Sequence, residues 1–103
     1  MTTDGEATAS SVGPVLQSGH AADVVVAAIR ALNPHVVLID RGAYVRVLVP
    51  HRCVLKRDAI ESRLGRPFHL PGDLESIMPA FKGRFRVDED EAVWELHGGR
   101  APG

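Results

Sequence analysis

Apolar residues recur at helical spacing in two stretches of the chain, which predicts two main helices. In residues 21–32 the apolar positions fall three or four apart, and Asn33-Pro34 ends the pattern because proline disfavours the helical region for the residue before it. In residues 57–64 two apolar residues lie four apart, and Gly65 followed by Pro67 supplies the stop. We therefore expect helices over 21–32 and 57–64.

Alternating apolar and polar residues predict antiparallel strands in the segments around these helices. Residues 12–16 predict a first strand, and Pro14 limits it to a sheet edge or to a strand start, because proline donates no hydrogen bond to a ladder. Residues 36–40 and 43–49 predict a hairpin around Arg41-Gly42, since glycine permits the positive dihedral angle of a tight turn.

The second strand of this hairpin has one face for the core and one for the outside. The expected core face carries Ala43, Val45, Val47 and Val49. The opposite face carries Tyr44, Arg46 and Leu48. After a turn, residues 53–55 predict a third strand of the same meander.

The C-terminal part of the chain predicts a second hairpin around an acidic turn at 88–91. Its inward-facing residues are Phe85, Val87, Trp94 and Leu96. Before it, residues 71–80 predict one helical turn at most, because Pro79 excludes a long regular element. Strands joined by tight turns and interleaved with two helices indicate an α+β fold with antiparallel sheets.

Length and composition change this picture little. A chain of 103 residues with 45% hydrophobic residues suits one compact domain, which we expect over 12–97 between a disordered tail (1–11) and a flexible tail (98–103). The net charge of -1 offers no broad positive field for nucleic acid. The longest apolar stretch, 24–29, is far shorter than the roughly 20 residues of a membrane span. With no secretory signal pattern at the N-terminus, we expect a cytoplasmic protein.

Groups that could carry chemistry are sparse. His51 and Cys53 lie two apart and would face the same side of a strand, as a thiol and base pair or two metal ligands would. A structural zinc site needs about four ligands, however, and no second cysteine is present. The acidic run at 88–91 lacks the spacing of a calcium loop and is typical of a solvated turn. The residues thus favour a binding function over catalysis, by elimination.

The first helix has an apolar stripe wider than one core face requires. Its two charges, Asp23 and Arg30, share one side with Val26 and Ala27 beside them. Two interpretations stay open: the flanking residues pack under a tail or loop, or they form a second buried surface against a partner.

Several segments, taken in order, resemble the effector (coupling) proteins of toluene and alkene monooxygenases, which are related to the phenol hydroxylase and soluble methane monooxygenase regulatory components. The segments are Val12-Gly13-Pro14-Val15, Asn33-Pro34, Asp40 to Val47, Leu64-Gly65-Arg66-Pro67-Phe68, Ala80-Phe81-Lys82-Gly83 and Asp88-Glu89-Asp90. The resemblance spans about 85 residues and leaves out the two tails. It implies a protein without cofactor or catalysis, monomeric when free, that docks on a diiron hydroxylase in a system with a Rieske ferredoxin and a reductase.

The resemblance also implies where docking occurs. The loop at Asn33 and Pro34 and the neighbouring helix, with Asp23, Val26 and Arg30, are the first candidates for the partner-binding surface. Asn33 is equally suited to capping the helix C-terminus. Tyr44 and Arg46 are second candidates because tyrosine and arginine are favoured interface anchors, and packing of Tyr44 under the tail competes with that role.

Some features depart from the family pattern or fit another class. The link between Pro34 and the next strand is short, and the His51-Cys53 turn has no counterpart with a role, so the substrate, aromatic or alkene, stays open. A small hydrolase or metal-binding protein that uses His51 and Cys53, or a generic protein-interaction module, is the alternative.

Overall fold

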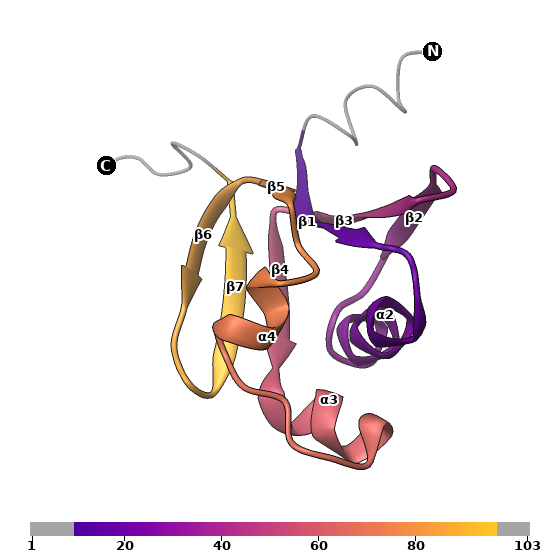
Figure 1. Ribbon diagram of the computed structural model, residues 1–103. Coiled ribbons are helices and arrows are strands. Elements are labelled where there is room, and N and C mark those ends of the chain that lie inside the picture. Colours follow the sequence, from indigo (N-terminus) through magenta and orange to yellow (C-terminus); the bar gives the residue numbers. More distant parts are fainter. Residues whose placement is uncertain (1–9, 97–103) are drawn as a thin grey trace.

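The computed structural model describes residues 10–96 as two antiparallel sheets with three helices, which confirms the expected α+β class (Figure 1). The predicted tails, 1–11 and 98–103, lie outside the described residues apart from Ser10 and Ser11. The strands are β1 (Ser11–Gln17), β2 (Val37–Asp40), β3 (Tyr44–Pro50), β4 (Arg52–Lys56), β5 (Ala80–Lys82), β6 (Arg84–Val87) and β7 (Glu91–Glu95). The helices are α2 (His20–Leu32), α3 (Arg57–Leu64) and α4 (Gly72–Glu75).

The first sheet has the strand order β2-β3-β1-β5, so β1 lies inside the sheet and not at its edge. The expectation drawn from Pro14 is therefore wrong. The register with β3 pairs Val12 with Val49 and Val15 with Arg46, and skips Gly13 and Pro14 between them. These two residues pair instead with β5. Because the ladder with β3 is interrupted where the proline N–H is missing, an interior strand can hold a proline.

The second sheet has the order β4-β7-β6, and its strands β6 and β7 form the predicted C-terminal hairpin with Phe85 opposite Trp94. Strand β4 was expected to extend the meander of β2 and β3, and this expectation is wrong. His51 adopts a left-handed conformation (φ 67°) and turns the chain into the second sheet, where β4 pairs with β7. The β2–β3 hairpin itself is confirmed, with Gly42 at φ 79° in its turn.

Helix α2 lies beneath the first sheet and covers its lower face (Figure 1). We call this lower face the inner face and the upper one the outer face. It also contacts β4 and α3, so it fills the angle between the two sheets. Fully buried Val25, Ala28 and Ile29 form its core stripe, as the helical spacing predicted. They pack with Val47 of β3 and Trp94 of β7 in one apolar cluster.

The remaining helices follow the predicted stop signals. Helix α3 ends at Gly65, whose left-handed conformation (φ 78°) and backbone N–H bond to the Glu61 carbonyl close the last turn. Helix α4 is the single turn allowed before Pro79. Strand β5 was not expected, because this region was left irregular. Within residues 10–96, no helix combines the length and the apolarity that crossing a bilayer requires.

Candidate functional site

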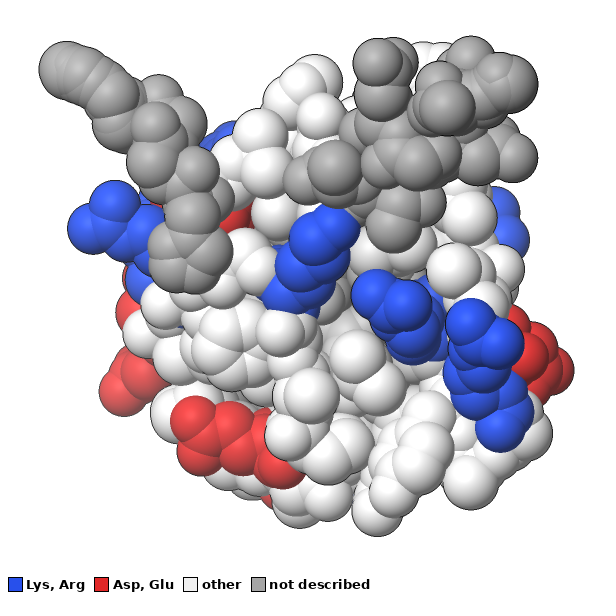
Figure 2. Space-filling model, turned by 90° about the horizontal axis from the view of Figure 1, so that it is seen from above, with Lys and Arg blue, Asp and Glu red and all other residues white. Residues whose placement is uncertain are grey.

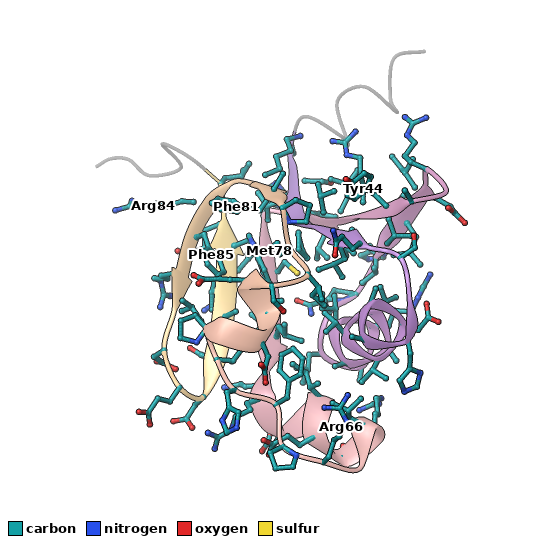
Figure 3. All side chains as sticks on the ribbon, viewed as in Figure 1. Tyr44, Arg66, Met78, Phe81, Arg84 and Phe85 are labelled. Carbon is teal, nitrogen blue, oxygen red and sulfur yellow. The ribbon has the colours of Figure 1, made fainter. Side chains whose placement is uncertain are left out.

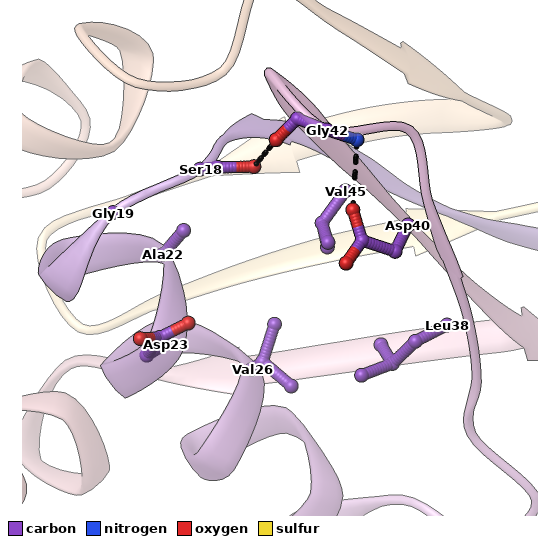
Figure 4. A pocket seen from close by; sticks show the side chains of 9 residues that line it. All are labelled: Ser18, Gly19, Ala22, Asp23, Val26, Leu38, Asp40, Gly42 and Val45. Carbon is purple, nitrogen blue, oxygen red and sulfur yellow. Dashed lines mark hydrogen bonds between the residues drawn. The ribbon is translucent and has the colours of Figure 1, made fainter.

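A groove separates the N-terminal half of α2 from the inner face of the β2–β3 hairpin (Figure 4). Its volume is about 380 Å³. The lining residues are Ser18, Gly19, Ala22, Asp23, Val26, Leu38, Asp40, Gly42 and Val45. The groove thus has an apolar floor between two carboxylates, and it includes Asp23 and Val26 from the predicted partner-binding set.

Hydrogen bonds across the groove hold its upper wall. The Ser18 hydroxyl donates to the Gly42 carbonyl at 2.6 Å, and the Gly42 N–H donates to Asp40 Oδ1 at 2.8 Å (Figure 4). The first bond ties the hairpin turn to the segment that leads into α2, because Ser18 lies two residues before that helix, whereas the second lies within the turn itself. Val26 packs against the core while part of its side chain stays accessible, and Asp23 is exposed. The wide apolar stripe on α2 therefore borders a hollow rather than a covering loop.

Asn33 is engaged inside the molecule. Its Nδ2 donates to the carbonyls of Ile29 and Val54, both at 2.8 Å, and its Oδ1 accepts the Val54 N–H at 3.0 Å. The side chain caps the last turn of α2 and joins it to β4 in the other sheet. The capping interpretation accounts for these bonds, whereas contact of Asn33 with a partner stays a prediction. Pro34 beside it is exposed.

We predict that Asn33→Ala lowers the free energy of unfolding by about 2 kcal/mol, because it leaves the Val54 backbone groups and the Ile29 carbonyl without their side-chain partner. Urea denaturation followed by the fluorescence of the single tryptophan measures this change. Pro34→Ala is the matched control, since Pro34 is exposed and its replacement removes no hydrogen-bond donor. Equal stability of Asn33→Ala and the wild type would contradict the capping role.

Tyr44 and Arg46 lie on the other face of the hairpin, away from α2. Register places Arg46 opposite Ile39 on β2 and opposite Val15 on β1, so these three side chains share the outer face of the first sheet. Arg46 also lines a hollow of about 270 Å³ together with Leu48, Phe81 and Lys82. The predicted partner-binding residues therefore fall on two surfaces that the first sheet separates.

Two exposed apolar residues were missed from the sequence. Phe81 and Val37 are 45% and 53% exposed, which is unusual for large apolar side chains next to other apolar residues. Val37 lies on the outer face opposite Leu48, whereas Phe81 pairs with buried Pro14 and its ring lies 5.1 Å from that of Phe85, so it faces the second sheet (Figure 3). The alternation in 36–40 did mark Val37 as a strand residue, but periodicity alone does not say whether a face is covered. Phe81 lies in the segment around β5 that showed no clear period.

Cys53 and His51 do not form a reactive pair. Cys53 is fully buried opposite Trp94, and burial raises the pKa of its thiol to about 12. Because the thiolate is the nucleophile and the metal ligand, Cys53 is inert near neutral pH. His51 is exposed at the turn between the sheets. Residues 10–96 contain no group of three or more side chains suited to holding a metal ion.

The acidic turn at residues 88–91 is held by hydrogen bonds to the side chain of Asp88. Asp88 Oδ1 accepts the backbone N–H groups of Asp90 at 2.8 Å and Glu91 at 2.9 Å. The backbone hydrogen bonds from Asp90 and then Glu91 lower the pKa of Asp88. The carboxylate thus stabilises the turn between β6 and β7, as an aspartate at such a position commonly does.

Comparison with known proteins gives a consistent result. The sequence model of the MmoB/DmpM family matches residues 10–95. The effector subunit of the alkene monooxygenase system of Xanthobacter autotrophicus (strain ATCC BAA-1158 / Py2) is 44% identical over 85 residues, which cover 81% of this chain and 83% of that protein.

Two solved structures share the fold. Both are chains from structures of a phenol hydroxylase and regulatory protein complex, with TM-scores of 0.75 and 0.72 at 21% and 22% identity. The matches cover 84% of this chain and 98% and 99% of those chains. The family match spans nearly all described residues, and the chain belongs to the MmoB/DmpM family of monooxygenase effector and regulatory subunits, not to the catalytic components.

Proposed function

We propose that this chain binds the diiron hydroxylase of a bacterial multicomponent monooxygenase and tunes its conformation, coupling and turnover. The observation that carries the proposal is the 44% identity to an alkene monooxygenase effector subunit over most of both chains. The inert Cys53 adds support, because the alternative of a hydrolase or metal protein built on His51 and Cys53 would need a reactive thiolate.

A protein without a reactive group can change an oxidation only by binding one conformation of the hydroxylase better than another. A shift of the hydroxylase from about 1% to about 99% of the active conformation requires about 10⁴-fold discrimination, or about 5.5 kcal/mol. A domain of this size can supply that through an interface of standard size, which buries on the order of 800 Å² on its side.

The same proposal places the chain in the cytoplasm, as a monomer when free, beside a Rieske ferredoxin and a reductase. We further propose that the oxidised substrate is an alkene, because the effector relative is assigned to an alkene monooxygenase system. The aromatic alternative is represented among the structural matches, but at 21% and 22% identity these support the fold alone.

The test is a titration of the purified chain into a fixed amount of its cognate hydroxylase, with ferredoxin, reductase and NADH present. We expect product formation to rise several-fold and to saturate, and the ratio of product formed to NADH consumed to increase. A short alkene and toluene are assayed side by side. The rate of epoxide formation from the alkene and the rate of cresol formation from toluene distinguish the two substrate classes.

An unrelated protein of similar size, added at the same concentrations, controls for nonspecific stabilisation of the hydroxylase. A flat titration with the alkene and with toluene would contradict the proposed function. Faster turnover with toluene than with the alkene would contradict only the substrate assignment.

A further inference from the structure

The outer face of the first sheet is a large apolar surface that no helix covers in the described part of the chain (Figure 1). Tyr44 and Val37 on this side are 41% and 53% exposed, whereas Leu48 beside Val37 is nearly buried. In antiparallel sheets of globular proteins, one face commonly meets water and then carries polar residues. Here it carries aromatic and aliphatic residues instead, as protein interfaces do.

The charge on this face has one sign. The charged side chains of residues 10–96 that line its hollow are Arg46 and Lys82, both basic, and none of the lining side chains in this range is a carboxylate. Arg46 forms no ion pair within residues 10–96. Its neighbours across the sheet, Ile39 and Val15, are both apolar. Figure 2 shows basic side chains in the middle of this view and acidic ones toward its edges. Ion pairs such as that between Lys56 and Glu91, at 2.7 Å, lie on the second sheet.

On this basis, and resting on the proposed function, we propose that the outer face of the β2-β3-β1-β5 sheet docks on a hydroxylase surface that presents a carboxylate among apolar side chains. The carboxylate pairs with Arg46, and the apolar groups cover Tyr44 and Val37. Arginine suits this role because its planar guanidinium binds a carboxylate through two hydrogen bonds, and its positive charge is only weakly hydrated.

The groove beside α2 is the weaker candidate for the main contact. Its apolar floor is recessed between Asp23 and Asp40, and Asn33 at the far end of the helix is already hydrogen-bonded to the backbone. By contrast, the sheet face is broad. Strands about 4.8 Å apart, with residues about 3.4 Å apart, give it an area of at most 400 Å² or so. That is about half of the area that one partner buries in a standard interface, so the sheet face can form the central part of such an interface.

The test compares two charge reversals that differ only in location. Arg46→Glu changes the sheet face, and Arg30→Glu changes the exposed side of α2 across the sheet. Binding of each variant to the purified cognate hydroxylase is measured by titration calorimetry at low and moderate salt. We expect Arg46→Glu to raise Kd by about 100-fold and to weaken the salt dependence, whereas Arg30→Glu stays within about threefold of the wild type. Tyr44→Ala is expected to raise Kd about tenfold.

Circular dichroism and tryptophan fluorescence establish that each variant is folded. The proposal is overturned if Arg46→Glu and Tyr44→Ala bind like the wild type, and above all if Arg30→Glu then loses affinity. It is also overturned if sedimentation shows that the face joins two copies of this chain, or if removal of residues 1–9 increases affinity because that segment occupied the face. Absence of any binding by the wild type would instead refute the proposed function.

Discussion

Trp94→Ala is expected to lower the free energy of unfolding by about 3–5 kcal/mol, a large share of the 5–15 kcal/mol typical of a domain. Trp94 is completely buried between the outer strands of the second sheet, opposite Cys53 on β4 and Phe85 on β6. Its ring stacks on that of Phe85 with centroids 5.2 Å apart. Urea denaturation followed by circular dichroism measures the loss, because the variant no longer contains a tryptophan.

Trp94→Phe is the control that separates ring packing from the polar group of the indole. The buried Trp94 Nε1 has no hydrogen-bond partner among the described residues, and burial of an unpaired donor costs free energy. Phenylalanine removes that cost while it keeps the contact with Phe85, so we expect a loss of only about 1–2 kcal/mol. Equal losses for the two variants would show that the additional volume of the indole, and not its stacking on Phe85, carries the stability.

Hairpins and helices were predictable from the sequence because their signals are local. The turn at Gly42 and the alternation on both sides of it fix the register of β2 on β3, and the same holds for β6 and β7 around Asp88. The stops at Asn33 and Gly65 likewise act on their own helices. In each case the neighbours in sequence are also the neighbours in space.

The errors concern pairings between distant parts of the chain. Strand β4 follows β3 after a turn of one residue, yet it pairs with β7 about 40 residues later. Only the left-handed His51 reveals that change of sheet, and although histidine adopts a positive φ more often than most residues, its presence alone does not predict one. Similarly, Pro14 indicated an edge strand because the pattern could not show that the ladder to β3 skips it.

The candidate site was predictable in part for the same reason. Helical periodicity identified the stripe of Asp23, Val26 and Arg30, since that stripe depends on one element alone. The outer sheet face combines residues of β3 with Val15 of β1 and Lys82 of β5, which lie about 30 or more residues away along the chain. Whether a strand face is covered depends on every other element of the fold, so the exposure of Val37 required the structure.

A chain that acts by selecting a conformation must itself keep a fixed shape, because flexibility in the binding surface would reduce the discrimination it can deliver. The described features serve that need. Asn33 fastens α2 to the second sheet, and the bond from Ser18, two residues before α2, to Gly42 fastens the start of the helix to the first. The outer face is thus held from below by a helix that is tied to both sheets.

Gly13→Ala is the second large effect that we expect, because Gly13 lies directly against the backbone of β3. Its φ of 148° is rarely adopted by residues with side chains, and a Cβ atom there would collide with the backbone carbonyl of Val47. Strain of the backbone costs about 1–3 kcal/mol, and a collision that forces the backbone to shift costs about 1–3 kcal/mol more. We therefore expect a loss of about 3 kcal/mol or more in urea denaturation, with the β1–β3 ladder opened near Arg46.

Gly19→Ala separates the two causes, because Gly19 has almost the same φ, 149°, but open space within 4 Å of its would-be Cβ. Only the conformational strain should then appear, and we expect Gly19→Ala to lose about 1–2 kcal/mol. Since Gly13 lines the hollow beside Arg46, its replacement should also weaken hydroxylase binding, while Gly19→Ala should not. Equal stability losses for the two variants would mean that the collision with Val47 is relieved at no cost, and that β1 is held less closely to β3 than the structure indicates.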